Sequence, residues 1–151
     1  MPISFRFYNS QQLILAKGTD PLSDSDCIDH AHQILSHPDF APGFVELLDL
    51  RNANDNNLTG MGVFMTARAV LPYRSRLKKS RLAILVANEA MYGMARMYQL
   101  SIGEFFKGIQ AFRNLDEALE FIGLDPSTYN SLKSMPELPR EAADDPGHLS
   151  E

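Results

Sequence analysis

The sequence is poor in the residue types that define several large classes of protein. It has a single cysteine, Cys27, and no tryptophan among its 151 residues. One cysteine cannot form an internal disulfide, which excludes a disulfide-stabilised scaffold and fits a reducing compartment. No apolar run approaches the roughly 18 residues of a membrane-spanning helix, so no transmembrane segment is predicted.

Positive charge is also scarce. The chain has 14 Lys and Arg residues against 19 Asp and Glu residues, a net charge of −5, and the six acids and two bases of residues 125–151 account for −4 of it. Nucleic-acid binding depends on cationic surface for phosphates, so no nucleic-acid partner is expected. The first residues lack the basic-then-apolar plan of a signal peptide, and we expect a cytoplasmic protein.

Catalytic and metal-binding patterns are missing as well. His30 and His32 lie on one predicted helix but point to different faces, so we read them as surface residues. The Asn-rich stretch 52–56 imitates the start of a calcium loop, yet Val63 stands where the bidentate Glu is needed. Cys27 falls inside a predicted helix, and no Gly-x-Ser-x-Gly is present. We therefore expect no catalytic residue, no metal and no cofactor, and an enzyme is the least supported class.

What is present is a regular alternation of strands and helices. Short apolar or alternating runs typical of strands are separated by stretches with apolar residues at helical spacing. The order ββαβαβαβα predicts one α/β domain over residues 1–124, with a five-stranded mixed sheet, an antiparallel first strand, otherwise mainly parallel strands, and four helices. The predicted strands span residues 3–9, 12–18, 44–50, 81–88 and 107–113, and the predicted helices span 24–36, 58–72, 89–102 and 115–122.

The strand 44–50 is the expected centre of the sheet, because its nearly continuous apolar run suits a strand covered on both faces. The next helix carries an apolar stripe, which we expect to face the core: Leu58, Met61, Phe64, Met65 and Ala69. Five methionines of the second and third helices are interpreted as core residues, with an adaptable apolar pocket as the alternative: Met61, Met65, Met91, Met94 and Met97.

Residues 125–151 form an acidic segment that contains four of the nine prolines. Such a composition is typical of a tail rather than of a packed domain. We nevertheless expect this tail to pack on the domain surface or on a second subunit, through Tyr129, Leu132, Met135 and Leu138.

The loop that follows the central strand is rich in Asn and Asp, and the helix after it begins with two glycines. Backbone N–H groups at a helix start are unsatisfied and form the positive end of the helix dipole, so they can meet an acidic or phosphate group. Thr59 is the expected N-cap. We expect a partner to bind at Asp55, Asn57, Leu58, Thr59, Gly60, Met61 and Gly62.

The segment from Leu48 to Val63 resembles the bacterial anti-sigma-factor antagonists, the STAS domains. Those proteins carry an apolar strand, a short polar loop, Asp-Ser-Ser/Thr-Gly, and then Leu/Met-Gly-Val at the start of a helix. The stretch Tyr92–Tyr98 is similar to a helix start in other bacterial STAS-like proteins, and the strand–helix order is compatible with the wider STAS and CRAL-TRIO-like group. The resemblance implies a STAS-type α/β fold and a non-enzymatic regulatory module that contacts a protein partner, with a homo-oligomer expected.

One departure from the family pattern concerns the phosphorylated serine, which directly follows the Asp in the resembled proteins. Here Asn57 and Leu58 occupy those two places, and leucine accepts no phosphate. Thr59 fills the second hydroxyl position, where we favour the N-cap over a phosphoacceptor. The phosphorylation switch is therefore predicted to be lost, while the helix-end geometry is kept.

Two alternatives stay open. A cationic run after the second helix is read as a solvated connector, with an anion or lipid-headgroup site as the other interpretation: Arg74, Arg76, Lys78 and Lys79. The second candidate function is a carrier of a small apolar ligand or lipid, which the CRAL-TRIO resemblance permits, with the methionine-bearing helices as its walls.

Overall fold

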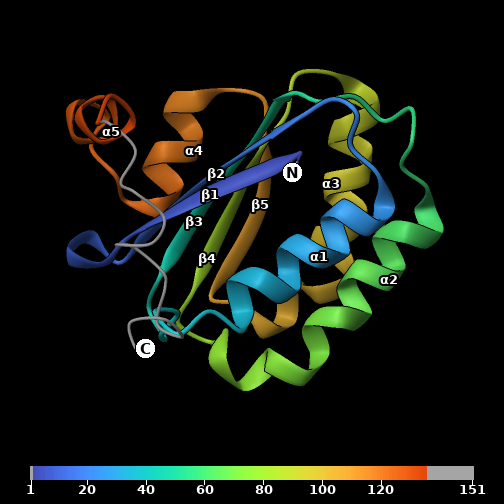
Figure 1. Cartoon of the computed structure of the whole chain (residues 1–151), viewed down its shortest axis with the longest axis horizontal. Helices are drawn as coiled ribbons and strands as arrows, with labels where there is room; N and C mark the ends of the chain where they lie inside the picture. The colour runs from blue at the N-terminus through green and yellow to red at the C-terminus, as the bar shows by residue number, and fades with distance from the viewer. Residues whose placement is uncertain (1, 136–151) are drawn as a thin grey trace, which may run out of the picture.

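Five strands form one mixed sheet in the order β1-β2-β3-β4-β5 in the computed structural model, which describes residues 2–135 (Figure 1). β1 runs antiparallel to β2, and every other neighbouring pair is parallel. The α/β class, the antiparallel first strand and the central position of the strand after residue 44 are confirmed. The strands are β1 (Ile3–Tyr8), β2 (Leu13–Thr19), β3 (Val45–Asn52), β4 (Arg81–Leu85) and β5 (Gly108–Phe112).

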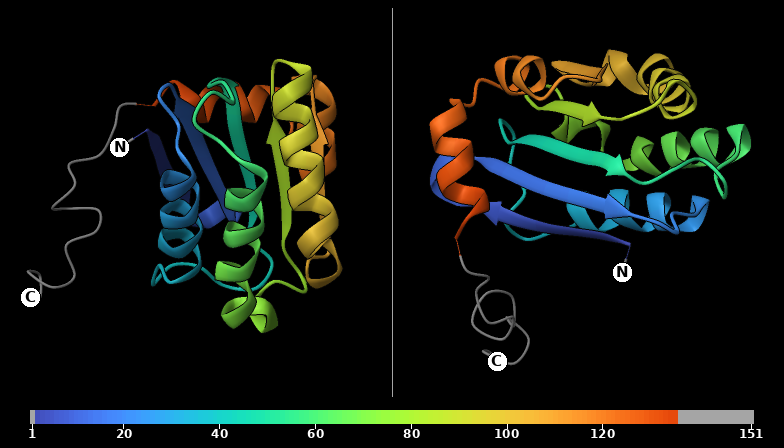
Figure 2. Two further views of the ribbon diagram at one scale, coloured as in Figure 1. Left: turned by 90° about the vertical axis from the view of Figure 1, so that its right-hand side faces the viewer. Right: turned by 90° about the horizontal axis from the view of Figure 1, so that it is seen from above.

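Helices cover both faces of this sheet (Figures 1 and 2). One face carries α1 (Asp24–Leu35), α2 (Gly60–Val70) and α3 (Glu89–Ile102), and the other carries α4 (Leu115–Ile122) and α5 (Pro126–Lys133). Short 3-10 helices connect some of the elements: η1 (Asn9–Gln11), η2 (Leu71–Arg76) and η3 (Gly103–Phe105). The right-hand view of Figure 2 shows the resulting three layers.

The predicted number of four helices was wrong, because α5 is a fifth helix within the segment read as a tail. Pro126 suits a first helical position, and the Asp125 side chain accepts hydrogen bonds from the backbone N–H groups of Ser127 and Thr128. Tyr129 and Leu132 are buried, as expected for anchors. Met135 is half exposed, and the fourth expected anchor, Leu138, lies outside the described residues.

Alternation along the strands produces two hydrophobic clusters, one on each face of the sheet. On β2, Ile14 belongs to the cluster under α1–α3, whereas Leu13 belongs to the cluster under α4 and α5. On β3, Leu50 belongs to the cluster under α1–α3 and Leu47 belongs to the cluster under α4 and α5. The central strand is therefore covered on both faces, as its apolar sequence predicts.

The expected inward direction was wrong for three residues of the α2 stripe, whereas Leu58 packs against the core as predicted. Met61, Phe64 and Met65 are 68%, 52% and 45% exposed. The buried residues of this helix are smaller: Gly62, Thr66, Ala67 and Val70. The reason is the close approach of α1, because a Cβ atom on Gly62 would overlap the carboxylate of Asp24.

The interpretation of the methionines as core residues holds for only part of the set. Met91 is buried and Met94 is partly buried on the inner side of α3. Met61, Met65 and Met97 are exposed, so the core interpretation was wrong for these three.

Candidate functional site

The recognition corner, which we define as residues 51–62, lies at the carboxyl end of β3 and continues into the first turn of α2 (Figure 1). Thr59 is the N-cap of α2, and its hydroxyl oxygen accepts a hydrogen bond from the Gly62 N–H at 2.9 Å. The predicted N-cap role is confirmed. The side chain of Thr59 thereby satisfies one of the unpaired donors at the start of the helix.

A carboxylate of the same chain already lies at this helix end. Asp24, in the first turn of α1, accepts from the Thr59 backbone N–H at 3.0 Å and from the Thr59 hydroxyl at 2.7 Å. Among the expected partner-binding residues, Thr59 and Gly62 therefore have their N–H groups bonded inside the domain. The negative charge that favours a helix N-terminus is supplied by α1.

The loop before α2 is held by further hydrogen bonds. Asp20 accepts from the backbone and the side-chain amide of Asn54 at 2.7 and 2.8 Å. The Leu58 N–H donates to the carbonyl of Asp55 at 3.1 Å, and Asn57 forms an isolated parallel bridge with Ser23. The structure therefore brings the predicted partner-binding residues together on an ordered corner, on which Asn57, Thr59 and Met61 are exposed.

Next to this corner, five large apolar side chains lie exposed on α2 and α3. We call them the α2–α3 apolar surface: Met61, Phe64, Met65, Met97 and Leu100. The two helices lie side by side in the left-hand view of Figure 2. A Cβ atom on Gly60 would lie 3.3 Å from the Met97 methyl group, so the surface is continuous with the corner. Large exposed apolar patches are uncommon on monomeric soluble proteins, and those that occur often mark sites of interaction.

The inner sides of α1, α2 and α3 line a cavity of about 120 Å³. It lies between α1, α2, α3 and the sheet, and its walls are largely apolar, with contributions from Leu48, Leu58, Ile84, Met91 and Met94. Asp24 and Gly62 also line it, so one end of the cavity lies directly beneath the recognition corner.

Two polar side chains pair inside this apolar space. The His30 Nε2 atom lies 2.7 Å from a carboxylate oxygen of Glu46, and their side chains are 7% and 13% exposed. The prediction that His30 is a surface residue was wrong. The missed signal was Glu46 itself, because it interrupts the apolar strand β3 on the face that α1, α2 and α3 cover.

Two other groups that line the cavity hold their protons. Burial raises the pKa of the Cys27 thiol to about 12, and the nearby carboxylates of Asp24 and Asp26 add to the effect. Burial also raises the pKa of Tyr98, and the carboxylate of Glu46 raises it further. The cavity therefore contains a neutral thiol and a neutral phenol at ordinary pH, and neither is activated as a nucleophile.

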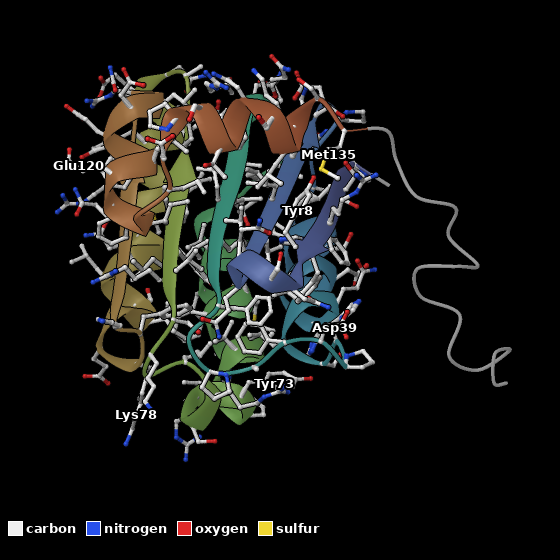
Figure 3. The ribbon with its side chains drawn as sticks, turned by 90° about the vertical axis from the view of Figure 1, so that its left-hand side faces the viewer. Tyr8, Asp39, Tyr73, Lys78, Glu120 and Met135 are labelled. Carbon is white, nitrogen blue, oxygen red and sulfur yellow. The ribbon has the colours of Figure 1, made fainter. Side chains whose placement is uncertain are left out.

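The cations predicted as a possible anion site do not converge on one point. Arg76 donates to the backbone carbonyls of Leu35 and Phe40 at 2.6 Å each, which satisfies the C-terminal end of α1 and the loop after it. Arg74 donates to the Leu71 carbonyl at 2.9 Å. Lys78 and Lys79 are exposed, and Lys78 points away from the domain (Figure 3).

A basic groove on the opposite face of the sheet was not predicted. It lies over β1, β2 and β3 beside α5, has a volume of about 450 Å³, and contains Arg6, Lys17, Arg51 and Lys133 with one acid, Asp49. Tyr8 and Met135 line it and mark its position in Figure 3. The available signal was the alternation of the strands, which places these strand cations on one face.

The described residues hold no group of three or more His, Cys, Asp or Glu side chains able to bind a metal ion. In the same part of the chain, no helix is both long enough and apolar enough to cross a membrane. No protein-family model matches the sequence, and no curated protein matches it.

Proposed function

We propose that this protein is a non-enzymatic, STAS-like interaction module that binds a protein partner through the recognition corner and the adjoining α2–α3 apolar surface. The observation that carries the proposal is the outward direction of Met61, Phe64 and Met65 on a helix whose inner face is built from small residues. Large apolar side chains in water add little to folding, but they supply binding energy when a partner covers them.

The chemistry of this surface suits a protein contact. Methionine side chains adapt to partners of different shape, and Phe64 supplies an aromatic ring of the kind that often dominates interface energetics. The polar corner beside the apolar surface offers backbone and Asn groups, so the arrangement combines an apolar centre with a polar margin. The phosphorylation switch of the resembled family forms no part of this proposal, because Asp24 occupies both the N–H and the hydroxyl of Thr59.

Site-specific photo-crosslinking in cells tests the proposal. A photoreactive residue at Met61 is expected to capture one defined protein, which a second copy of this chain would also satisfy. The matched control carries the same residue at Glu120, an exposed position of α4 on the other side of the sheet (Figure 3). Equal labelling from the two positions, together with a monomer in sedimentation velocity, would overturn the proposal.

A matched pair of substitutions locates the binding energy. Phe64→Asp places a charge at the centre of the apolar surface and is expected to weaken the captured complex by about 30-fold or more, equal to about 2 kcal/mol. Arg68→Asp, one turn further along α2, changes an exposed charged position and is expected to alter the affinity by less than about fivefold. Equal losses from both variants would contradict a contact centred on Phe64.

The cavity under α1–α3 favours a second candidate function, the binding of a small apolar molecule. A volume of about 120 Å³ is close to that of an engineered cavity of roughly 150 Å³ that binds benzene. It lies well below the roughly 300–1,000 Å³ of pockets for drug-sized ligands, so a compact molecule is favoured over a lipid. Native mass spectrometry of protein purified from cells is expected to show a small added mass, and the mass of the bare chain alone would count against this candidate.

A further inference from the structure

We infer that the cavity beneath the recognition corner selects a neutral monocyclic molecule with one hydrogen-bond donor, such as a phenol, over a purely apolar molecule of the same size. The inference rests on the second candidate function, because it names the class of ligand for that cavity. The side chains of Glu46 and Tyr98 carry it.

Glu46 supplies a directional acceptor in largely apolar surroundings. One of its carboxylate oxygens is 2.7 Å from the His30 Nε2 atom, and His30 is the one hydrogen-bond partner of this carboxylate among residues 2–135. The other oxygen therefore has its acceptor capacity left for a donor inside the cavity that Glu46 lines. Hydrogen bonds to a charged acceptor are stronger than those between neutral groups, and low surrounding polarity strengthens them further.

Tyr98 provides a second polar group close to the first. The Glu46 carboxylate acts electrostatically on the Tyr98 hydroxyl, and both residues line the cavity. Because burial keeps Tyr98 protonated, its hydroxyl can donate to a ligand oxygen while Glu46 accepts from that ligand. A hydroxyl group matches this donor and acceptor pair with a single atom.

The remaining walls set the size and the charge of the ligand. Ile84, Met91 and Ala95 present only carbon and sulfur atoms, and the volume of about 120 Å³ suits one six-membered ring. A cationic amine would exchange its hydration for two carboxylates that already have partners, Glu46 with His30 and Asp24 with Thr59, which is unfavourable in a largely apolar space. The walls therefore favour a neutral ligand.

Phenol and benzene form the matched pair of probes, and the methionine methyl groups report where they bind. In the full-length protein with labelled methionine methyls, phenol is expected to shift the signals of Met91 and Met94, which line the cavity. The signals of Met61 and Met65, on the outer side of α2, are expected to stay unchanged. Phenol is expected to bind about tenfold more tightly than benzene, equal to about 1.4 kcal/mol.

Two pairs of variants separate the cavity from its polar groups. Ala95→Leu fills the cavity and is expected to abolish the binding of both probes, whereas Ala90→Leu, at an exposed position of the same helix, leaves both unchanged. Glu46→Gln is expected to bring the phenol preference below about threefold, with Glu104→Gln as the exposed control. Tyr98→Phe keeps the ring, is expected to fold and removes only the hydroxyl. The preference for phenol over benzene is expected to fall in this variant as well.

The outcomes are distinct. Equal affinity for phenol and benzene, with binding lost in Ala95→Leu, overturns the selection of a donor and leaves the apolar cavity as a binding site. If neither probe binds, the selection of a donor and the cavity as a binding site are both overturned. Shifts at Met61 and Met65 with none at Met91 identify surface binding and also overturn the inference.

Discussion

On the α4–α5 side of the sheet, the helices turn their largest apolar side chains inward, whereas on the α1–α3 side α2 turns them outward. Leu119, Ile122 and Tyr129 are buried on the first side. Met61 and Phe64 are exposed on the second, where small residues of α2 face α1. The comparison separates side chains that stabilise the domain from side chains that the fold leaves exposed to solvent, and the small inner residues of α2 leave space for the cavity under α1–α3.

Truncation of a large side chain on the α4–α5 side and of one on the α1–α3 side should give the largest difference in the free energy of unfolding. Leu119→Ala removes a fully buried side chain of α4 and is expected to lower the free energy of unfolding by about 3 kcal/mol. Phe64→Ala is expected to lower it by less than about 0.5 kcal/mol, because half of the ring is already exposed to water. Urea denaturation measures both values, and comparable losses would break the comparison.

Two helical glycines give the next largest difference. Gly62→Ala is expected to cost about 1–3 kcal/mol, because the new methyl group overlaps an Asp24 carboxylate that two hydrogen bonds hold in place. Gly93→Ala on α3 has open space around its Cβ and is expected to stabilise the protein by about 0.5–1 kcal/mol.

The Gly62 result has its own internal check. In the double variant with Asp24→Ala, much of the added cost of Gly62→Ala should disappear, since the obstructing carboxylate is gone. Additive losses in thermal or urea unfolding would show that the close approach of α1 and α2 is not the cause.

A single hydroxyl tests the attachment of α5. The Tyr8 hydroxyl donates to the Leu132 carbonyl at 3.2 Å, so Tyr8→Phe is expected to cost about 1 kcal/mol. Tyr73→Phe, at the other end of the domain, removes a longer 3.5 Å contact with His32 and is expected to change stability by less than about 0.3 kcal/mol. Equal free energies of unfolding for the two variants in denaturation curves would show that the Tyr8–Leu132 hydrogen bond does not stabilise the packing of α5.

The smallest effect at neutral pH concerns Cys27. Because the folded pKa is raised to about 12 from 9.0, the unfolded chain releases this proton first as the pH rises. The contribution of the protonated thiol to the free energy of unfolding is complete below pH 9 and is lost between about pH 9 and 12. The free energy of unfolding should therefore fall over that interval, and it should fall less in Cys27→Ala.

Thiol labelling checks the same pKa independently, since the chain has one cysteine. At pH 8 the native protein should react with a thiol reagent at least tenfold more slowly than the chain in urea. A native rate equal to the unfolded rate would contradict the raised pKa.

Much of the fold could be predicted because local sequence signals agreed with the final packing. Asn114 and Gly123 bound α4 at both ends, and α3 begins and ends where its spacing predicts. The apolar run after Phe44 identified the central strand. In α5 the local signal was also present in Asp125 and Pro126, but the acidic composition of the whole segment obscured it.

The candidate site was less predictable because it depends on contacts between distant segments. The stripe of α2 has the expected helical spacing, yet spacing alone cannot say that α1 approaches Gly62 too closely for a larger side chain. The pairing of His30 with Glu46 joins α1 to β3, and the partnership of Asp24 with Thr59 joins two helix starts. Neither pairing has a local sequence pattern.

The Asp24 carboxylate at the start of α2 has a consequence for how this domain can receive a signal. The corner contains a carboxylate of its own, because Asp24 bonds to both the N–H and the hydroxyl of Thr59 in the folded domain. A phosphate group on Thr59 would be repelled by the neighbouring Asp24 carboxylate. At a helix start without such a carboxylate, the same phosphate group would be attracted. Under the proposed function, we expect a signal at this corner to act by displacing or covering Asp24, through a partner on α2 or a ligand in the cavity beneath it.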